Sequence, residues 1–270
     1  MISVHVEEHA KFFRDRHIGH TKFFRLLLDT KARIPFTLLI ARVKEDERCL
    51  ACDKEILEEI LSTTNMEVGL HIHPSLAAYP YKRQKKIILR EYKRFIMETG
   101  MTPRTFSGGH WCVNNDTLKI IRELGIAVDA SVVPGCVVTA NNGAIVKHGD
   151  SKREPYWVSE SDLWTASPNG VLLETPVSID GEGRILDLCL MPLWDIRKHL
   201  CDLSRSDTCR AYLHMTFHSY DVFSAGSERN FIYGKILHVC DLVYSEFKKV
   251  NFVTCFDYYS HMKETYEAGH

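Results

Sequence analysis

Strand-like and helix-like segments alternate along almost the whole of this 270-residue chain. Short apolar runs predict strands at residues 2–7, 36–41, 67–73, 104–107, 126–132, 171–178, 211–218 and 251–256. Amphipathic stretches predict helices at residues 17–30, 54–61, 81–98, 116–124, 195–203 and 231–248. Repeated strand–helix units favour a parallel sheet with helical crossovers, which is either a barrel or a doubly wound sheet.

Periodicity does not separate those two folds, but the chain has neither of the glycine-rich phosphate loops that favour a nucleotide-binding open sheet. Its length is normal for one α/β barrel, and no domain boundary or repeat is visible. We therefore expect residues 1–270 to form a single-domain α/β protein, a distorted barrel. Residues 134–170 are rich in Gly, Pro, Asn and Ser and predict a loop excursion with a small hairpin around 156–158. A long loop on a barrel is more often functional than accidental.

The formal net charge is -1, which indicates no general attraction to nucleic acid or to a membrane. No apolar run approaches the ~18 residues that a membrane span requires. The first residues lack the basic segment of a signal peptide, so we expect a cytoplasmic protein with reduced cysteines. Cys49 and Cys52 form a single C-x-x-C pair without the second pair of a structural zinc site.

Histidines and one acid mark two predicted strand ends. His5 and Glu7 alternate with apolar residues and so share one face of the first strand. His71 and His73 share a face of another strand, about 7 Å apart at the backbone, and Pro74 follows them. The active site of a parallel barrel lies at the carboxyl ends of its strands. Two imidazoles and a carboxylate there would form a catalytic zinc set with an open position for water, although Co²⁺, Ni²⁺ and Mn²⁺ also suit these ligands.

His218 ends a third strand, 211–218. At the rim of a metal-holding barrel, a histidine is suited to act as a general acid, because imidazole exchanges protons near neutral pH. The structural alternative is that these histidines are ordinary core residues.

Several stretches resemble, in order, the motifs of the polysaccharide deacetylases, carbohydrate esterase family 4, in the subgroup with H-x-H-P. The stretches are E-V-G-L-H-I-H-P at 67–74, F-S-G-G-H-W at 106–111, L-G-I-A-V-D-A-S at 124–131, L-E-T-P-V-S at 173–178 and L-H-M-T-F-H-S at 213–219. The resemblance implies a (β/α)7-type barrel and the metal-dependent removal of an acyl group from an amino sugar.

The resemblance also assigns roles. Glu7, His71 and His73 would hold the metal, and His218 would protonate the leaving amine. His5 stands where the family has its aspartate base, and would serve as base or as a further metal ligand. In an alternative register, Glu7 is the base and Glu8 the ligand.

Two positions depart from the family pattern. Ser107 and His110 replace the arginines of its motif. The changes fit either a rearranged site, with His110 able to reach the metal or substrate, or a barrel that has lost hydrolysis.

The expected substrate is an amino sugar or a glycan precursor for surface polysaccharide assembly, an expectation that rests on family analogy. Trp111 is the best-placed aromatic side chain for stacking on a sugar; Tyr79, Trp157 and Trp164 are further candidates. The alternatives are a metal- or sugar-binding barrel without deacetylase activity, and a metal-dependent hydrolase of a non-sugar amide or ester. The sequence does not determine the oligomeric state.

Overall fold

The computed structural model describes residues 1–6, 23, 26–28, 34–41, 54–63, 65–140, 143–149, 151–205, 211–219 and 231–268. The strands are β1 (Ile2–Val6), β2 (Thr37–Ala41), β3 (Glu67–Ile72), β4 (Thr105–Gly108), β5 (Val128–Asp129), β6 (Val137–Thr139), β7 (Ile145–Lys147), β8 (Tyr156–Trp157), β9 (Leu173–Glu174) and β10 (Met215–His218). The α-helices are α2 (Lys54–Thr63), α3 (Tyr81–Thr99), α4 (Asn115–Glu123), α5 (Leu193–Ser204), α6 (Phe231–Glu246) and α7 (Cys255–Ala268). Two 3₁₀ turns are η2 (Leu76–Ala78) and η3 (Gly109–Trp111).

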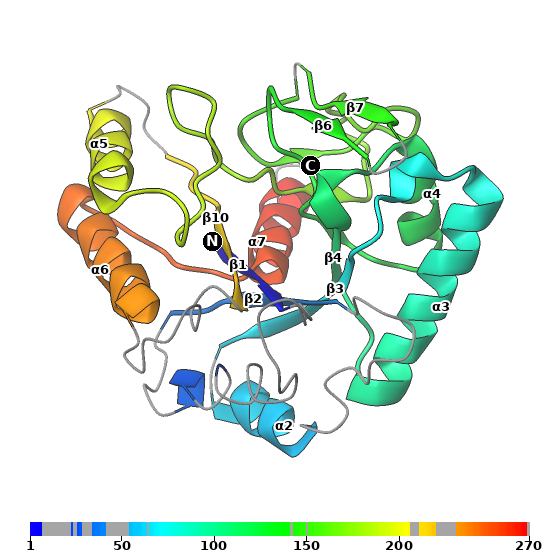
Figure 1. Cartoon of the computed structure of the whole chain (residues 1–270), viewed down its shortest axis with the longest axis horizontal. Coiled ribbons are helices and arrows are strands. Elements are labelled where there is room, and N and C mark those ends of the chain that lie inside the picture. The colour runs from blue at the N-terminus through cyan, green and yellow to red at the C-terminus, as the bar shows by residue number, and fades with distance from the viewer. Residues whose placement is uncertain are drawn as a thin grey trace.

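One eight-stranded sheet forms the centre of the molecule, in the order β10-β1-β2-β3-β4-β5-β9-β8. Every neighbouring pair in it is parallel except β8 with β9 at the edge. The sheet curls into an incomplete barrel with helices outside it (Figure 1). This arrangement confirms the predicted distorted (β/α)7-type barrel.

Alternation along β1 and β10 separates the core from the barrel interior. Val4 and Phe217 are Cα partners on the outer face and belong to the main hydrophobic core under the helices. Ser3 with Thr216, and His5 with His218, are the partners on the inner face. Polar side chains therefore line the interior, and the strands are buried on both faces, as expected of parallel strands.

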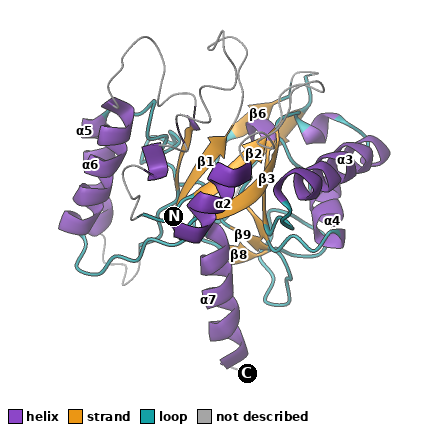
Figure 2. Cartoon of the chain, turned by 90° about the horizontal axis from the view of Figure 1, so that it is seen from below, coloured by secondary structure: helices purple, strands orange, loops and turns teal. Residues whose placement is uncertain are grey.

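Helices cover the outer face of the sheet on several sides. Figure 1 shows α3 and α4 together beside β3 and β4, α5 and α6 together beyond β10, and α2 below the sheet. Helix α7 instead starts at the amino ends of the strands and runs away from the sheet (Figure 2). The backbone N–H of Cys255 donates to Thr37 Oγ1, and that of Phe256 donates to Glu67 Oε2. These bonds fix the start of α7 under β2 and β3.

The prediction of a strand at 251–256 was wrong, because helix α7 begins within that range. Thr254 and Asp257 form reciprocal bonds: Thr254 N–H donates to Asp257 Oδ2, and Asp257 N–H donates to Thr254 Oγ1. This is a capping box with aspartate as its acid, and the sequence T-C-F-D carries its signature. Helix α4 begins at Asn115, one residue before the predicted start, and its N-cap is Asn114.

The excursion at 134–170 contains more structure than predicted. Strands β6 and β7 form an antiparallel hairpin of their own. The predicted hairpin around residues 156–158 is present as an antiparallel bridge between Val158 and Ala166. In addition, β8 pairs with β9 and so joins the main sheet. The predicted helix at 17–30 and the pair Cys49 and Cys52 lie wholly or largely outside the described residues, although Phe23 and residues 26–28 are helical.

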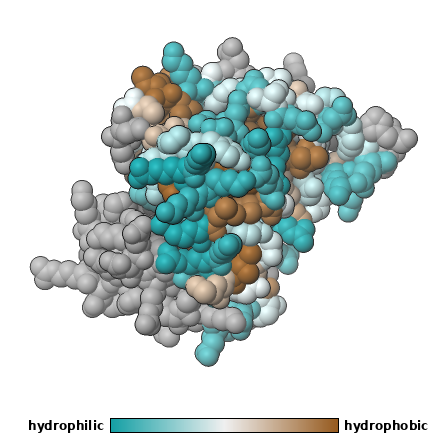
Figure 3. Space-filling view, turned by 90° about the vertical axis from the view of Figure 1, so that its right-hand side faces the viewer, coloured by the Kyte–Doolittle hydropathy of each residue, from teal (hydrophilic) through white to brown (hydrophobic). Residues whose placement is uncertain are grey.

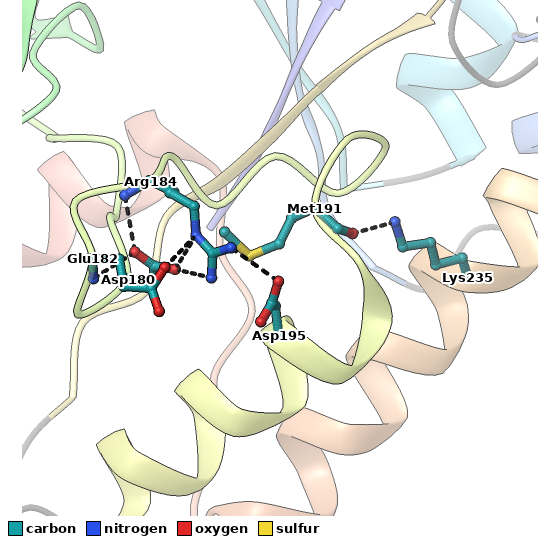
Figure 4. Close-up of polar contacts among 6 residues, drawn as sticks. All are labelled: Asp180, Glu182, Arg184, Met191, Asp195 and Lys235. Atoms are coloured by element: carbon teal, nitrogen blue, oxygen red, sulfur yellow. Dashed lines mark hydrogen bonds and ion pairs between the residues drawn. The ribbon is translucent and has the colours of Figure 1, made fainter.

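Polar contacts attach the loop after β9 to α5 and α6 (Figure 4). Arg184 forms ion pairs with Asp180, at 2.7 Å, and with the buried Asp195 on α5, at 3.1 Å. Lys235 on α6 donates to the carbonyl of Met191 at 2.6 Å. Both cations hold the connection that leads from the sheet into α5.

The side of the molecule with α3 and α4 is mostly hydrophilic, with small separate hydrophobic patches (Figure 3). Lys82, Arg83 and Lys86 are exposed on α3, as expected of a solvated helix face. Within the described part of the chain, no helix combines the length and the apolar character that crossing a membrane requires.

Candidate active site

Three histidine side chains from the carboxyl ends of β10, β1 and β3 meet inside the barrel. The ring centroids of His5 and His218 lie 5.1 Å apart, with nearly perpendicular planes. The ring of His71 stacks on that of His5 at 4.5 Å. His5 and His71 are buried, and His218 is half-buried. The predicted strand ends thus converge where a barrel holds its active site.

A second pair of histidines continues this group toward the surface. His73 follows β3, and its ring centroid lies 6.5 Å from that of His71. His110 on η3 lies 5.0 Å from His73 and is exposed. The Nδ1 atom of His110 is 3.4 Å from Ser75 Oγ. The structure therefore brings together five histidines that the sequence spreads over more than 200 residues.

The turn after β4 has a strained backbone. His110 and Trp111 adopt φ values of 53° and 51°, which are uncommon for residues with a side chain. Gly109 permits the turn, because a Cβ atom there would lie 1.8 Å from the carbonyl oxygen of His73. The indole of Trp111 faces His5 with centroids 6.1 Å apart. Strained backbone residues cluster at active sites, and these two lie beside the histidine group.

A backbone contact fixes the tautomer of His71. Its Nδ1 atom lies 2.8 Å from the carbonyl oxygen of Ser107. A carbonyl only accepts, so Nδ1 carries the hydrogen, and the lone pair of the neutral ring is on Nε2. Metal-binding histidines characteristically donate their second ring nitrogen in this way.

His148 is a contributor that the sequence did not single out. Its Nδ1 accepts from the N–H of Val133, and its Nε2 donates to the carbonyl of Trp111, both at 2.9 Å. Burial lowers the pKa of His148 to about 4, so the ring is neutral at pH 7. The loop excursion therefore stabilises the backbone of the strained turn through His148. No spacing rule relates residue 148 to residue 111, so only the fold reveals this contact.

His214 is a second buried histidine and lies one residue before β10. Its Nδ1 donates to the carbonyl of Thr175 at 2.9 Å, and burial lowers its pKa to about 3. Like His148, it is neutral at pH 7.

Three of the four aromatic candidates lie in contacts away from the histidine group. Trp157 packs against Tyr259 of α7 at 5.5 Å, and Trp164 against His148 at 5.0 Å. Tyr79 lies under the guanidinium of Arg83 at 4.3 Å. Trp111 is thus the candidate that contacts the histidine group.

The metal ligands predicted from the sequence are described only in part. His71 and His73 are placed, whereas Glu7 and Glu8 lie outside the described residues. Among the residues that are described, no three His, Cys, Asp or Glu side chains form a group able to hold a metal ion. The donor chemistry of His71 nevertheless fits a metal, because its tautomer directs the lone pair of Nε2 away from the strand.

Two buried carboxyl groups lie behind the site, and the sequence assigned them no role. Asp129 and Glu174 are Cα partners on β5 and β9, and both are fully buried. Burial raises the pKa of Asp129 to about 6. Burial and the neighbouring Asp129 raise the pKa of Glu174 well above its usual range. This pair therefore retains a proton under conditions in which exposed acids have lost theirs.

Several solved structures share the α/β barrel fold of this chain. No family model and no curated protein matches the sequence. A protein from Mycobacterium smegmatis described as a polysaccharide deacetylase superimposes with a TM-score of 0.62, at 15% identity, over 98% of this chain and 90% of its own. A polysaccharide deacetylase from Pseudomonas aeruginosa gives 0.61, at 13% identity, over 96% and 89%.

A PuuE allantoinase gives a TM-score of 0.60, at 12% identity, over 98% of this chain and 90% of its own. The chain therefore has the fold of the polysaccharide deacetylases, which confirms the fold that the resemblance to that family implied. The same fold also carries an allantoinase, so it does not by itself fix the substrate.

Proposed function

We propose that this protein belongs with the polysaccharide deacetylases and hydrolyses the N-acyl group of an amino sugar in a metal-dependent reaction. The observation that carries this proposal is the meeting of His5, His71 and His218 at the carboxyl ends of three strands, in a barrel of the deacetylase type. His73 and His110 extend the group toward the surface.

His71, His73 and Glu7 would hold the metal ion, for which Zn²⁺ suits two imidazoles and a carboxylate. A zinc ion bound there would supply Lewis acidity toward water and toward the acyl oxygen. The bond from His71 to the Ser107 carbonyl supports this assignment, because it fixes the tautomer that a ligand needs. The part of Glu7 rests on the sequence alone.

The protein's own groups would move the protons. His5 is buried between His71 and His218 and would accept a proton from the attacking water. His218 is half-buried at the end of β10 and would donate a proton to the departing amine. Their edge-to-face contact places base and acid on the same side of the barrel mouth.

The substrate would enter from the side of η3. His110 is exposed there, and Trp111 presents a partly buried aromatic ring beside His5. An aromatic face beside a polar group suits a sugar ring. An acylated amino sugar or glycan precursor is the substrate that we propose.

A second candidate is a barrel that binds a metal or a sugar without hydrolysis. Ser107 stands where the family resemblance expects the arginine that orients the base, and its Oγ donates to the Ala130 carbonyl at 3.3 Å. Ser107 is fully buried and carries no charge with which to orient a base. A third candidate, hydrolysis of a non-sugar amide, is favoured by the allantoinase of the same fold.

Elemental analysis of the purified protein tests the proposal first. We expect about one metal ion per chain, lost in His71→Ala/His73→Ala and retained in His238→Ala/His261→Ala, a control on two exposed histidines. The loaded protein is then assayed for release of acetate from N-acetylated sugars and from small amides. If the protein binds metal but releases no acetate from sugars, hydrolysis of the small amides supports the third candidate. No hydrolysis of the amides supports the second. No metal after incubation with Zn²⁺ or Co²⁺ rules out the metal-dependent proposal.

A further inference from the structure

A single peptide group joins His71 to the buried carboxyl pair. The carbonyl oxygen of Ser107 accepts from His71 Nδ1 at 2.8 Å. The N–H of Gly108, on the other side of the same peptide bond, donates to Ser131 Oγ at 2.8 Å. Ser131 then donates its own hydrogen to Asp129 Oδ1 in a short hydrogen bond. An unbroken chain of bonds thus leads from the imidazole to a carboxylate on the next strand.

This chain of bonds is shielded from water along its length. His71 is 2% exposed, and Ser107, Ser131 and Asp129 are fully buried. Hydrogen bonds in such surroundings are strong and polarise one another, and a peptide group bonded at both ends transmits that effect.

The carboxyl end of the chain is also held in place. Glu174 lies beside Asp129 and accepts from the N–H of Val132 at 3.2 Å. No described lysine or arginine forms an ion pair with either acid. The other titratable groups near the pair are the phenols of Tyr156 and Tyr212, which donate to the carbonyls of Leu163 and Pro176. The two acids therefore interact mainly with each other and with Ser131.

We infer that Asp129, Glu174 and Ser131 are positioning residues for His71, acting through the Ser107–Gly108 peptide group. They would hold this peptide in the orientation that keeps the hydrogen of His71 on Nδ1 and makes Nε2 a better ligand. In many metal sites, a carboxylate bonds directly to the ligand histidine for this purpose. In this chain the carboxylate lies one strand further away and acts through the backbone. The inference rests on the proposed function insofar as Nε2 binds a metal.

Histidine NMR on the metal-free protein tests the positioning directly. In ¹⁵N-labelled wild-type protein, we expect His71 as the Nδ1–H tautomer. Ser131→Ala removes the two hydrogen bonds through which Ser131 links Gly108 to Asp129, and the Nδ1 signal should shift toward a mixture of tautomers. Asp129→Asn keeps an oxygen acceptor for Ser131 but removes the carboxylate charge, and it should shift the signal less than Ser131→Ala does. Glu67→Gln, at a half-buried acid that begins β3, is the control that should change nothing at His71.

Metal titration then links the positioning to the site. Ser131→Ala should weaken Co²⁺ binding about 10- to 100-fold, the usual effect of losing such an outer partner. Asp129→Asn should weaken it less, and Glu67→Gln should stay close to wild type. An unchanged His71 tautomer together with unchanged Co²⁺ affinity in Ser131→Ala overturns the inference. If the wild-type protein binds no metal, the proposed function is wrong. The inference is then still tested by the His71 tautomer in the metal-free protein.

Ser131 is fully buried, so its replacement can prevent folding. In that event a titration of the wild-type protein from about pH 5 to 9 decides. The ¹⁵N signals of His71 should then follow the ionisation of the carboxyl pair, observed by ¹³C NMR of the labelled carboxyl groups. In Glu174→Gln that ionisation should move, and the His71 signals should move with it. Signals of His71 that ignore the carboxyl ionisation contradict the inference.

Discussion

The imidazole of His5 stacks on that of His71 at 4.5 Å, with the ring planes inclined by 23°, although strand β2 lies between their two strands. Neighbouring strands are about 4.8 Å apart, so β1 and β3 are separated by about twice that distance. The residue of β2 that pairs with His71 is Ala41, whose methyl group leaves room in the interior. Curling of the sheet and a small residue on β2 together allow the two rings to meet.

This contact makes His5 the residue whose replacement best tests the proposed chemistry. In a metal-loaded protein with deacetylase activity, His5→Ala should lower kcat/KM about 10²- to 10⁴-fold, the usual effect of losing a general base. The metal content should remain near that of the wild type, because His71 and His73 are intact. Steady-state kinetics beside elemental analysis measures both. Loss of the metal together with the activity would instead make His5 a ligand.

The close approach of Gly109 to His73 predicts a strict requirement for glycine. A methyl group at Gly109 would overlap the His73 carbonyl, whereas Gly181 has no atom within 4 Å of the corresponding position. We expect Gly109→Ala to destabilise the fold by about 1–3 kcal/mol, as overpacking does, and to displace His73. Gly181→Ala should be nearly neutral. Urea unfolding of both variants gives the comparison, and equal stabilities would show that the turn adapts.

The sequence predicted the fold well where local pattern and burial agree. The long helix α3 and the strands β1 and β3 lie within one or two residues of their expected ranges. The pattern failed at residues 251–256, where the apolar Phe252 and Val253 pack into the core without forming a strand. Apolar side chains mark burial, and burial alone does not specify the backbone conformation.

The same limit applies to the site. His5, His71, His73 and His218 were predicted because strand ends meet at one rim of a parallel barrel. The hydrogen bond from His148 to the Trp111 carbonyl was not predicted, since it depends on the path of an irregular loop. The peptide link from His71 to Ser131 is equally hidden, because it passes through backbone atoms that every residue has.

The capping box at the start of α7 leads to a prediction about stability. Thr254 Oγ1 accepts from the N–H of Asp257 at the start of α7. Thr254→Ala should therefore cost about 1 kcal/mol of unfolding free energy, with a range of about 0.5–2. The matched control is Thr265→Ala, on the exposed face of the same helix, where the hydroxyl donates to the His261 carbonyl. Chemical denaturation should separate the two variants, and equal effects would show that the cap does not stabilise α7.

The neutral state of buried His148 predicts a loss of stability in acid. Burial lowers its pKa from 6.5 to about 4, so the unfolded chain binds a proton more readily than the folded one. Its contribution to stability is complete above about pH 6.5 and declines as the pH falls toward 4. The lowering of the His148 pKa from 6.5 to about 4 corresponds to about 3 kcal/mol of stability at most.

His148→Gln should show this dependence by difference. Near pH 7.5 the variant should be the less stable protein, because a glutamine replaces the ring that joins Val133 to the strained carbonyl of Trp111. As the pH falls to about 5, the gap to wild type should narrow or reverse, since the variant has no imidazole to protonate. Urea denaturation at several pH values measures the gap, with the exposed His261→Gln as control. A stability difference that stays constant between about pH 7.5 and 5 would mean that His148 has the same pKa in the folded and unfolded chains. The neutral form of His148 would then not be what stabilises the strained turn.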